Sequence, residues 1–176
     1  MSYSAALAQI PVGVVVERRK ATSAWIDYVW HPVLVLAGQP DTAPWTPLAV
    51  SDETTTFYAG SADVGLHRAD TTYYRDNLAT GAPLLWVALR PTGVEPPYDI
   101  LMVTASPAEG EALTETGTDL VETVPMPDLV RDAVAAFVAE HHVEQVFFKR
   151  KRDSATMPER RAPGSAPRAP TREDEP

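Results

Sequence analysis

Apolar residues recur at every second position in several parts of the chain, which is the period of a half-buried β-strand. In the clearest case, the stretch 26–36, one parity is occupied by Ile26, Tyr28, Trp30, Leu34 and Leu36. Pro32 lies within this stretch and has no amide donor, so it predicts an edge position or a bulge. The β-branched stretch 10–17 predicts another strand, in which Gly13 indicates a bulge or a close approach of neighbouring backbone.

The next part of the chain predicts a hairpin and an irregular loop. The stretches 54–59 and 62–68 flank Gly60 and Ser61, a Gly-X pair typical of a tight hairpin turn. The segment 38–47 carries three prolines and is expected to be an irregular loop.

Three later stretches also predict strands. The continuous apolar runs 84–89 and 100–104 predict central strands covered on both faces, and 120–124 predicts one more. The segment 91–97 between the two runs is rich in proline and glycine, so we expect it to be irregular.

Capping residues predict three helices. Asp70 is placed to cap a short helix through Ala79. Ser106, followed by proline and by glutamate three residues later, predicts a capped helix that ends at Gly117. The stretch 127–143 has helical periodicity, with an apolar stripe formed by Val130, Ala133, Val134, Phe137 and Val138.

Together these elements predict an α+β fold. We expect a mainly antiparallel sheet, curled into a partial barrel and covered by the C-terminal amphipathic helix 127–143, with a pleckstrin-homology-like domain as one specific version. The organisation expected is a flexible N-terminus over 1–9, a single domain over 10–148, and a disordered, basic, proline-rich tail over 149–176.

Charge divides the chain of 176 residues into two parts of opposite sign. Residues 1–148 hold 7 Lys and Arg against 19 Asp and Glu, a net charge of −12, whereas residues 149–176 hold 8 against 5, a net charge of +3. An acidic domain repels a phosphate backbone, which argues against specific nucleic-acid binding. The chain has no cysteine, no secretory signal pattern over 1–9 and no apolar run of membrane length, so we expect a cytoplasmic protein.

No complete catalytic, cofactor or metal motif occurs in the sequence. His141 and His142 are adjacent, and neighbours on a helix point about 100° apart, so they cannot chelate one ion as an i, i+4 pair does. There is no Gly-x-Ser-x-Gly elbow for a serine nucleophile. These absences favour a protein without catalytic residues, cofactor or metal.

One short segment has the composition of a small-anion site. Arg75 could grip a carboxylate or phosphate while Tyr74 stacks on a ring, and Asn77 and Arg90 could complete the set. The same residues could instead be scaffold, with Arg75 paired to a neighbouring aspartate and Asn77 capping the helix.

The start of the tail is the most distinctive local composition. Two aromatic residues precede four positive charges in the series Phe147, Phe148, Lys149, Arg150, Lys151 and Arg152. Such a series could anchor an acidic protein partner through its rings and charges. Alternatively, the two rings complete the core and the basic residues keep the chain end solvated.

Several strings resemble one bacterial family of unknown function: PVGVVVERRKATS (11–23), DTAPWTPL (41–48), YRDNLATGAP (74–83), RPTGVEPPY (90–98) and FFKRKRD (147–153). The resemblance covers about residues 10–153. Genes of this family tend to lie beside molybdenum-dependent formate dehydrogenase, and members are sometimes labelled molybdopterin-guanine dinucleotide biosynthesis protein A. The resemblance implies an association and supplies no catalytic residues.

The guanylyltransferase activity in that label conflicts with the residues. A strand ending in Leu36, Ala37 and Gly38 is similar to the start of that enzyme class, but Pro40 and Asp41 follow. Proline lacks an amide donor and aspartate repels phosphate, and no lysine lies between Lys20 and Lys149.

We therefore expect a non-catalytic accessory or assembly factor that binds a formate dehydrogenase subunit or a maturation protein. A protein that binds a small anion, such as a pterin or nucleotide, or an enzyme of molybdenum cofactor metabolism, is one alternative. A small structural subunit of a complex is another. The oligomeric state stays open.

Overall fold

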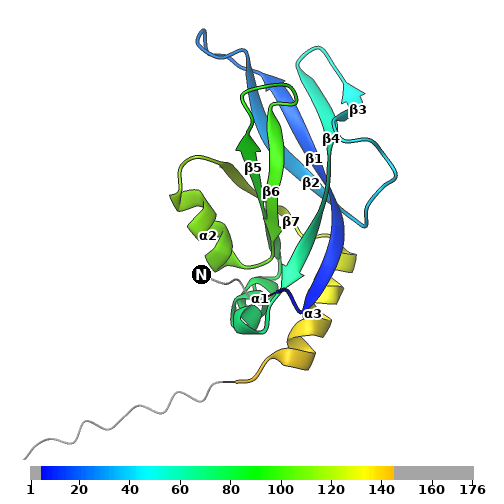
Figure 1. Cartoon of the computed structure of the whole chain (residues 1–176), viewed down its shortest axis with the longest axis vertical. Coiled ribbons are helices and arrows are strands. Elements are labelled where there is room, and N and C mark those ends of the chain that lie inside the picture. The colour runs from blue at the N-terminus through cyan, green and yellow to red at the C-terminus, as the bar shows by residue number, and fades with distance from the viewer. Residues whose placement is uncertain (1–4, 145–176) are drawn as a thin grey trace, which may run out of the picture. The chain divides into compact units, whose positions relative to one another are not determined.

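Two antiparallel sheets frame residues 5–144, the part of the chain that the computed structural model describes (Figure 1). Sheet A has the strand order β2-β1-β4-β3, formed by β1 (Ala8–Lys20), β2 (Tyr28–Ala37), β3 (Thr46–Val50) and β4 (Thr54–Leu66). Sheet B has the order β6-β5-β7, formed by β5 (Leu84–Pro91), β6 (Tyr98–Thr104) and β7 (Leu120–Pro125). The α+β, antiparallel class expected from the sequence is therefore confirmed.

Strand β1 lies inside sheet A, because it pairs with β2 on one side and with β4 on the other. Val12, Val14 and Val16 share one parity of this strand, and all three are fully buried in the core. Gly13 lies between them, where a Cβ atom would come within 2.8 Å of Cε2 of Tyr58. The atoms that approach this glycine closely belong to side chains, so the backbone approach predicted here is not confirmed, and the bulge in the pairing with β4 lies one residue later, between Val14 and Val15.

Strand β2 is an edge strand and also carries a bulge, so both expectations for Pro32 are confirmed. The pairing with β1 passes from Leu34 opposite Val15 to Pro32 opposite Val16, which leaves Val33 as the extra residue. Such a bulge accommodates a residue that cannot donate to the ladder.

The predicted hairpin turn at Gly60 and Ser61 is wrong, because β4 continues through both residues as one long strand. Its partner β1 pairs with it from Ala8 to Arg19, and the register shifts between Val14 and Val15, opposite Gly60. Gly60 has a φ of 139° and serves this bulge rather than a turn. The loop expected over 38–47 is also shorter than predicted, since β3 begins at Thr46.

Sheet B contains the three strands predicted from apolar runs. β5 is the central strand and pairs with both β6 and β7, so the central position predicted for 84–89 is confirmed. The central position predicted for 100–104 is wrong, because β6 lies at the edge of the hydrogen-bonded sheet. Side chains from both sheets, such as Val64, Leu85 and Leu89, are fully buried in one core. β4 lies against β6 and β2 lies against β7, but within residues 5–144 the strands do not form a closed barrel. A pleckstrin-homology-like fold is not confirmed.

The three predicted helices are present as α1 (Thr71–Ala79), α2 (Pro107–Glu115) and α3 (Asp128–His141), with a short 3-10 helix, η1 (Arg68–Asp70), before α1. Helix α3 buries Val130, Val134 and Phe137 and packs against α1. Ala133, predicted in its apolar stripe, is exposed. The expectation that α3 covers the sheet is not confirmed.

Helix α2 begins where the capping residues predict. The Ser106 hydroxyl accepts a hydrogen bond from the Glu109 amide at 3.4 Å. The Glu109 carboxylate bonds the hydroxyl of Thr104, and that hydroxyl accepts from the Ser106 amide at 3.1 Å. The Glu109 carboxylate and the Ser106 amide are therefore linked through the Thr104 hydroxyl and not directly.

Helix propensity alone would favour alanine at Gly110 by about 1 kcal/mol. In this fold, however, a Cβ atom at Gly110 would overlap the indole ring of Trp86, which lies in β5 beneath α2. We therefore expect Gly110→Ala to lower the free energy of unfolding by about 1–3 kcal/mol, measured by urea denaturation. Exposed Ala112 is the control, since Ala112→Gly should cost only about 1 kcal/mol. A more stable Gly110→Ala protein would contradict the packing.

Candidate functional site

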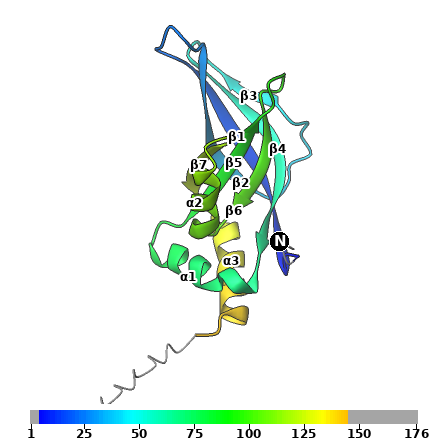
Figure 2. The ribbon, with the colours of Figure 1, turned by 60° about the vertical axis from the view of Figure 1, so that its left-hand side comes forward.

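Three strand connections gather at one end of the described chain, as Figures 1 and 2 both show. They are the β1–β2 turn (21–27), the β3–β4 turn (51–53) and the β5–β6 loop (92–97). The amide of Lys20 donates to the carbonyl of Glu53 at 3.0 Å and so links the first two turns. Helices α1 and α3 lie toward the opposite end in the same views.

Apolar side chains are exposed on all three connections or beside them. Trp25 is 93% exposed, and the other four are between 42% and 74% exposed. We call this set the hairpin surface, which consists of Trp25, Ile26, Tyr28, Val50 and Val94. Trp25 and Ile26 are adjacent in the sequence and both are exposed, and exposed apolar side chains that lie together commonly mark interaction sites.

A cluster of aromatic rings supports this end of the molecule from within. The ring of Trp30 lies 6.0 Å from that of Trp45, 5.8 Å from that of Phe57 and 6.0 Å from that of Tyr98. Because Trp30 is on β2, Phe57 on β4 and Tyr98 on β6, these contacts tie the two sheets together. Edge-to-face and tilted pairs at these distances are favourable arrangements of aromatic rings.

Arg18 stacks on this cluster from β1. Its guanidinium carbon lies 4.5 Å from the ring centre of Tyr28 and 5.4 Å from that of Phe57, within the range of a cation–π contact. The cation thereby holds Tyr28 in place at the border of the hairpin surface.

Trp45 has a strained backbone. Its φ of 64° lies in the left-handed region, which is unfavourable for a bulky residue. The ring packs edge-on against Trp30, and the Trp45 amide donates to the carbonyl of Tyr58. These contacts hold the backbone in a conformation that costs on the order of 1–3 kcal/mol.

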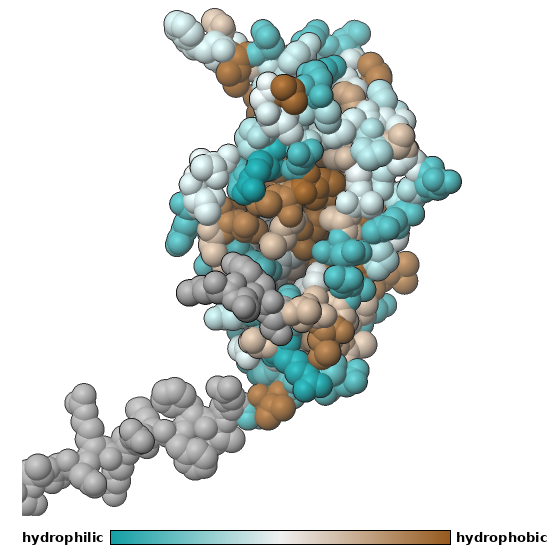
Figure 3. Space-filling view, viewed as in Figure 1, coloured by the Kyte–Doolittle hydropathy of each residue, from teal (hydrophilic) through white to brown (hydrophobic). Residues whose placement is uncertain are grey.

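Two pockets meet at Tyr28. A pocket of about 560 Å³, which we call the aromatic groove, is lined by Tyr28, Trp30, Tyr98 and the β5–β6 loop. A smaller, more polar pocket of about 170 Å³ lies between the β1–β2 and β3–β4 turns and includes Arg18 and Lys20. Figure 3 shows a further apolar, hollowed area on the viewed face, over β6 and beside β4.

Tyr74 and Asn77, two of the predicted ligand residues, point into the core. The hydroxyl of Tyr74 accepts a hydrogen bond from the His67 amide at 3.1 Å, and burial raises the pKa of Tyr74 to about 12. The Asn77 side chain donates to the carbonyls of Leu84 and Ala105 at 2.8 and 2.9 Å and accepts from the Leu84 amide at 3.0 Å. In this fold Asn77 joins α1 to β5 and to the start of α2.

Arg75 is exposed on α1 and pairs with Asp76 at 3.3 Å, as the scaffold alternative predicts. Its Nη1 atom also lies 3.0 Å from Nε2 of His142, and Nδ1 of His142 lies 3.2 Å from the hydroxyl of Thr71. The side chain therefore links α1 to the end of α3.

Arg90 lies apart from the other predicted ligand residues. It is six residues along β5 from Leu84, the contact of Asn77, which corresponds to about 20 Å along the strand. Its guanidinium binds Asp119 with two hydrogen bonds of 3.0 and 3.1 Å. The hydrogen bond from Arg90 lowers the pKa of Asp119, whose side chain is only 2% exposed. Arg75 and Arg90 therefore do not converge on one small ligand.

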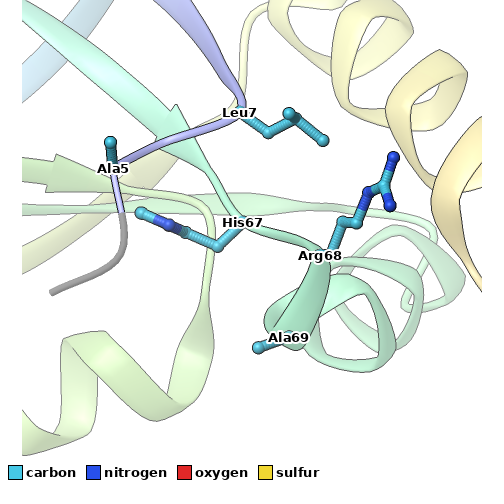
Figure 4. Close-up of a pocket in the computed structure, with 5 residues that line it drawn as sticks. All are labelled: Ala5, Leu7, His67, Arg68 and Ala69. Carbon is cyan, nitrogen blue, oxygen red and sulfur yellow. The ribbon is translucent and has the colours of Figure 1, made fainter.

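The other predicted surface, Phe147 to Arg152, lies outside the described residues. A pocket of about 520 Å³ lies at the helical end and is lined by Ala5, Leu7, His67, Arg68 and Ala69 (Figure 4). The side chains of His67 and Arg68 point in different directions there, so they do not form a single anion-binding position.

Histidine and carboxylate side chains are dispersed in the fold. His31 Nδ1 lies 2.8 Å from a carboxylate oxygen of Glu122 and bridges β2 to β7. The ring of His141 packs edge-to-face against that of Phe137, with the two ring centres 4.5 Å apart. Over residues 5–144, no three His, Asp or Glu side chains gather as metal ligands do. In the same range, no helix has both the length and the hydropathy for crossing a bilayer.

Sequence reasoning missed the hairpin surface. The alternating pattern assigns Ile26 to a half-buried strand, whereas the structure places it in the turn before β2, 53% exposed. The sequence signal that could have revealed this surface is the pair of large apolar residues, Trp25 and Ile26, in the connection between two strands.

Comparison with known proteins gives one match. A family model described as "Protein of unknown function (DUF3305)" matches residues 11–152. No curated protein and no solved structure matches the chain.

Substitutions of Asn77 and Arg75 test which of these two α1 side chains stabilises the fold. Asn77→Ala leaves the backbone groups of Leu84 and Ala105 without partners, so we expect it to lower the free energy of unfolding by about 2–4 kcal/mol. Arg75→Ala, two residues earlier and exposed, should change it by less than about 1 kcal/mol. Urea denaturation of both variants measures the difference, and equal losses would contradict these roles.

The pair of Arg90 and Asp119 should make stability depend on pH. Because the pKa of Asp119 is lowered in the folded state, its contribution is present at neutral pH and is lost as pH falls through that lowered pKa. Arg90→Met should therefore be less stable than the parent at pH 7, and the difference should shrink below about pH 4. Urea denaturation at pH 7 and pH 3 tests this, and a constant difference would count against it.

Proposed function

The chain belongs to the DUF3305 family of proteins of unknown function, and we propose that it is a non-catalytic accessory factor that binds a protein partner through the hairpin surface. The observation that carries the proposal is the exposure of Trp25, at 93%, next to exposed Ile26 and Tyr28. Tryptophan and tyrosine are the residues most enriched among those that dominate binding energy at protein interfaces.

The support beneath these side chains favours binding. Arg18 stacks on Tyr28, and the Lys20 amide is bonded to Glu53, so the turns are held before any partner arrives. A surface that is already ordered loses less conformational entropy on association.

The finer proposal concerns the identity of the partner. We propose a formate dehydrogenase subunit or a protein that matures this enzyme, and the support is the resemblance of the strings quoted above to a family encoded beside that enzyme. A long-lived complex would correspond to a structural subunit, and a transient one to an assembly factor.

Binding of a small anion, such as a pterin or nucleotide, is the weaker alternative. Arg75 and Arg90 are each paired with an aspartate and stand far apart, while Tyr74 and Asn77 are buried. No described contact favours a shared ligand for these four residues.

The hairpin surface can be tested by paired substitutions. The full chain, carrying an affinity tag, is co-expressed with formate dehydrogenase subunits, and the dissociation constant of the recovered complex is measured. Trp25→Ser with Ile26→Ser should weaken binding about 30-fold, which corresponds to the loss of about 2 kcal/mol at a central contact.

The control changes two other exposed apolar residues, Leu129→Ser with Val143→Ser, on and after α3. Binding by this variant should match the parent, and thermal unfolding should show that both variants fold. Equal affinity of the two double variants would rule out the hairpin surface. Absence of any complex with the dehydrogenase subunits would rule out that partner.

A further inference from the structure

The aromatic groove is lined by flat rings that stand close together. Its walls include the side chains of Tyr28, Trp30 and Tyr98 and the pyrrolidine rings of Pro91 and Pro97. The ring centres of Trp30 and Tyr98 are 6.0 Å apart, with 63° between the ring planes. Proline-rich segments bind in aromatic-lined grooves as a polyproline II helix, which loses little entropy because it is already extended.

Hydrogen-bond donors in the groove complement such a ligand. Trp30 carries an indole N–H, and Tyr28 and Tyr98 carry hydroxyl groups. Within residues 5–144 the three donors have no hydrogen-bond partner, and no buried side-chain nitrogen or oxygen there lacks one, so these donors reach solvent. A polyproline II segment has solvated carbonyl oxygens and no N–H at its prolines. It therefore presents acceptors where the groove presents donors.

The backbone of the groove offers little to a ligand that adds as a β-strand. Pro91 and Pro97 have no amide hydrogen, and the amide of Thr92 donates to the carbonyl of Pro97 at 3.0 Å. Strand addition needs a row of unpaired backbone groups. The groove therefore suits a ligand that is recognised through side chains.

The loop that forms one wall of the groove is held by Thr92. Its hydroxyl oxygen lies 2.8 Å from the carbonyl oxygen of Val94 and 2.6 Å from that of Pro96. It also accepts a hydrogen bond from the Val94 amide at 3.2 Å. A wall that is ordered in advance loses less entropy when a ligand binds.

The charge of the groove favours a basic ligand. Among its described lining residues, Glu95 alone is charged, and this residue is exposed. Residues 5–144 as a whole hold 7 Lys and Arg against 19 Asp and Glu. Arg18 contacts Tyr28 from the neighbouring polar pocket, so a basic side chain of the ligand is expected on the Glu95 side. A guanidinium group forms the strongest hydrogen bonds with such a carboxylate.

We propose that the aromatic groove binds a polyproline II segment of a partner protein, and that an arginine of this segment pairs with Glu95. The inference rests on the proposed function, because it names the kind of segment that the partner presents. The groove shares Tyr28 and Val94 with the hairpin surface. A partner that covers Trp25 and Ile26 therefore has the groove beside it.

Synthetic peptides test the groove without the dehydrogenase. The probe has four Pro-Pro-Arg repeats, and its arginines lie on one face of a helix with three residues per turn. Four Gly-Ser-Arg repeats keep the charge without proline, and four Pro-Pro-Glu repeats keep the prolines with the opposite charge.

The readout is the NMR spectrum of the full chain, labelled with nitrogen-15. We expect the probe to shift the indole N–H of Trp30 and the amides of Gly93 and Val94, while the amide of Gly110 on α2 keeps its position. The dissociation constant of the probe should be at least about tenfold lower than that of either control peptide.

A charge exchange tests the role assigned to Glu95. Glu95→Lys should weaken binding of the probe about tenfold and strengthen binding of the Pro-Pro-Glu peptide. Glu53→Lys is the matched control, because Glu53 is exposed on the β3–β4 turn and lines the polar pocket instead. It changes the net charge equally and should alter the affinity for the probe less than about threefold.

Three outcomes would overturn the proposal: no shifts at the groove, equal affinities for the probe and the Gly-Ser-Arg peptide, or equal losses in Glu95→Lys and Glu53→Lys. The last would mean general attraction to an acidic domain. Each of these leaves the proposed function standing if capture of the dehydrogenase subunits still depends on Trp25 and Ile26. Peptide binding by a protein that captures no such subunit would instead reject that partner and retain the groove.

Discussion

The pairing of β1 on both of its edges is the constraint on which the rest of the structure depends. One row of its side chains, Val12, Val14 and Val16, is fully buried in the core shared by the two sheets. Because the strand continues to Lys20, its last residues carry the pairing out to the end where the turns gather. The core and the candidate site therefore lie along the same strand, and Arg18, which follows the buried valines, stacks on the ring of Tyr28.

The two ends of the fold differ in which kind of side chain is buried and which is exposed. At the helical end, polar side chains such as Asn77 and Tyr74 are buried and hydrogen-bonded, so they join α1 to neighbouring strands and loops. At the hairpin end, aromatic rings supply the packing and apolar side chains remain exposed. A buried and satisfied polar group stabilises one structure, whereas an exposed apolar group is available to a second molecule.

Local signals in the sequence predicted most elements, because each depends on neighbouring residues alone. The cap at Ser106, the β-branched run of β1 and the bulge at Pro32 are of this kind. Gly60 was misassigned because a tight turn and a bulge both accept its positive φ, and only the partner strand decides between them. The aromatic cluster could not be predicted, since its rings come from strands whose order is a property of the whole fold. Arg90 was grouped with Arg75 for the same reason.

Trp45 shows how closely the loop before β3 is coupled to the aromatic cluster. At the positive φ of this residue, glycine would be more favourable than tryptophan. A tryptophan, in turn, would be more favourable on a backbone without this strain. The contacts of the ring with Trp30 and Phe57 offset that backbone preference, so the backbone conformation of Trp45 and the packing of its ring depend on each other. The backbone conformation before β3 is thus coupled to the aromatic cluster. A change that separates the rings of Trp30 and Trp45 should also alter the surface beside β3.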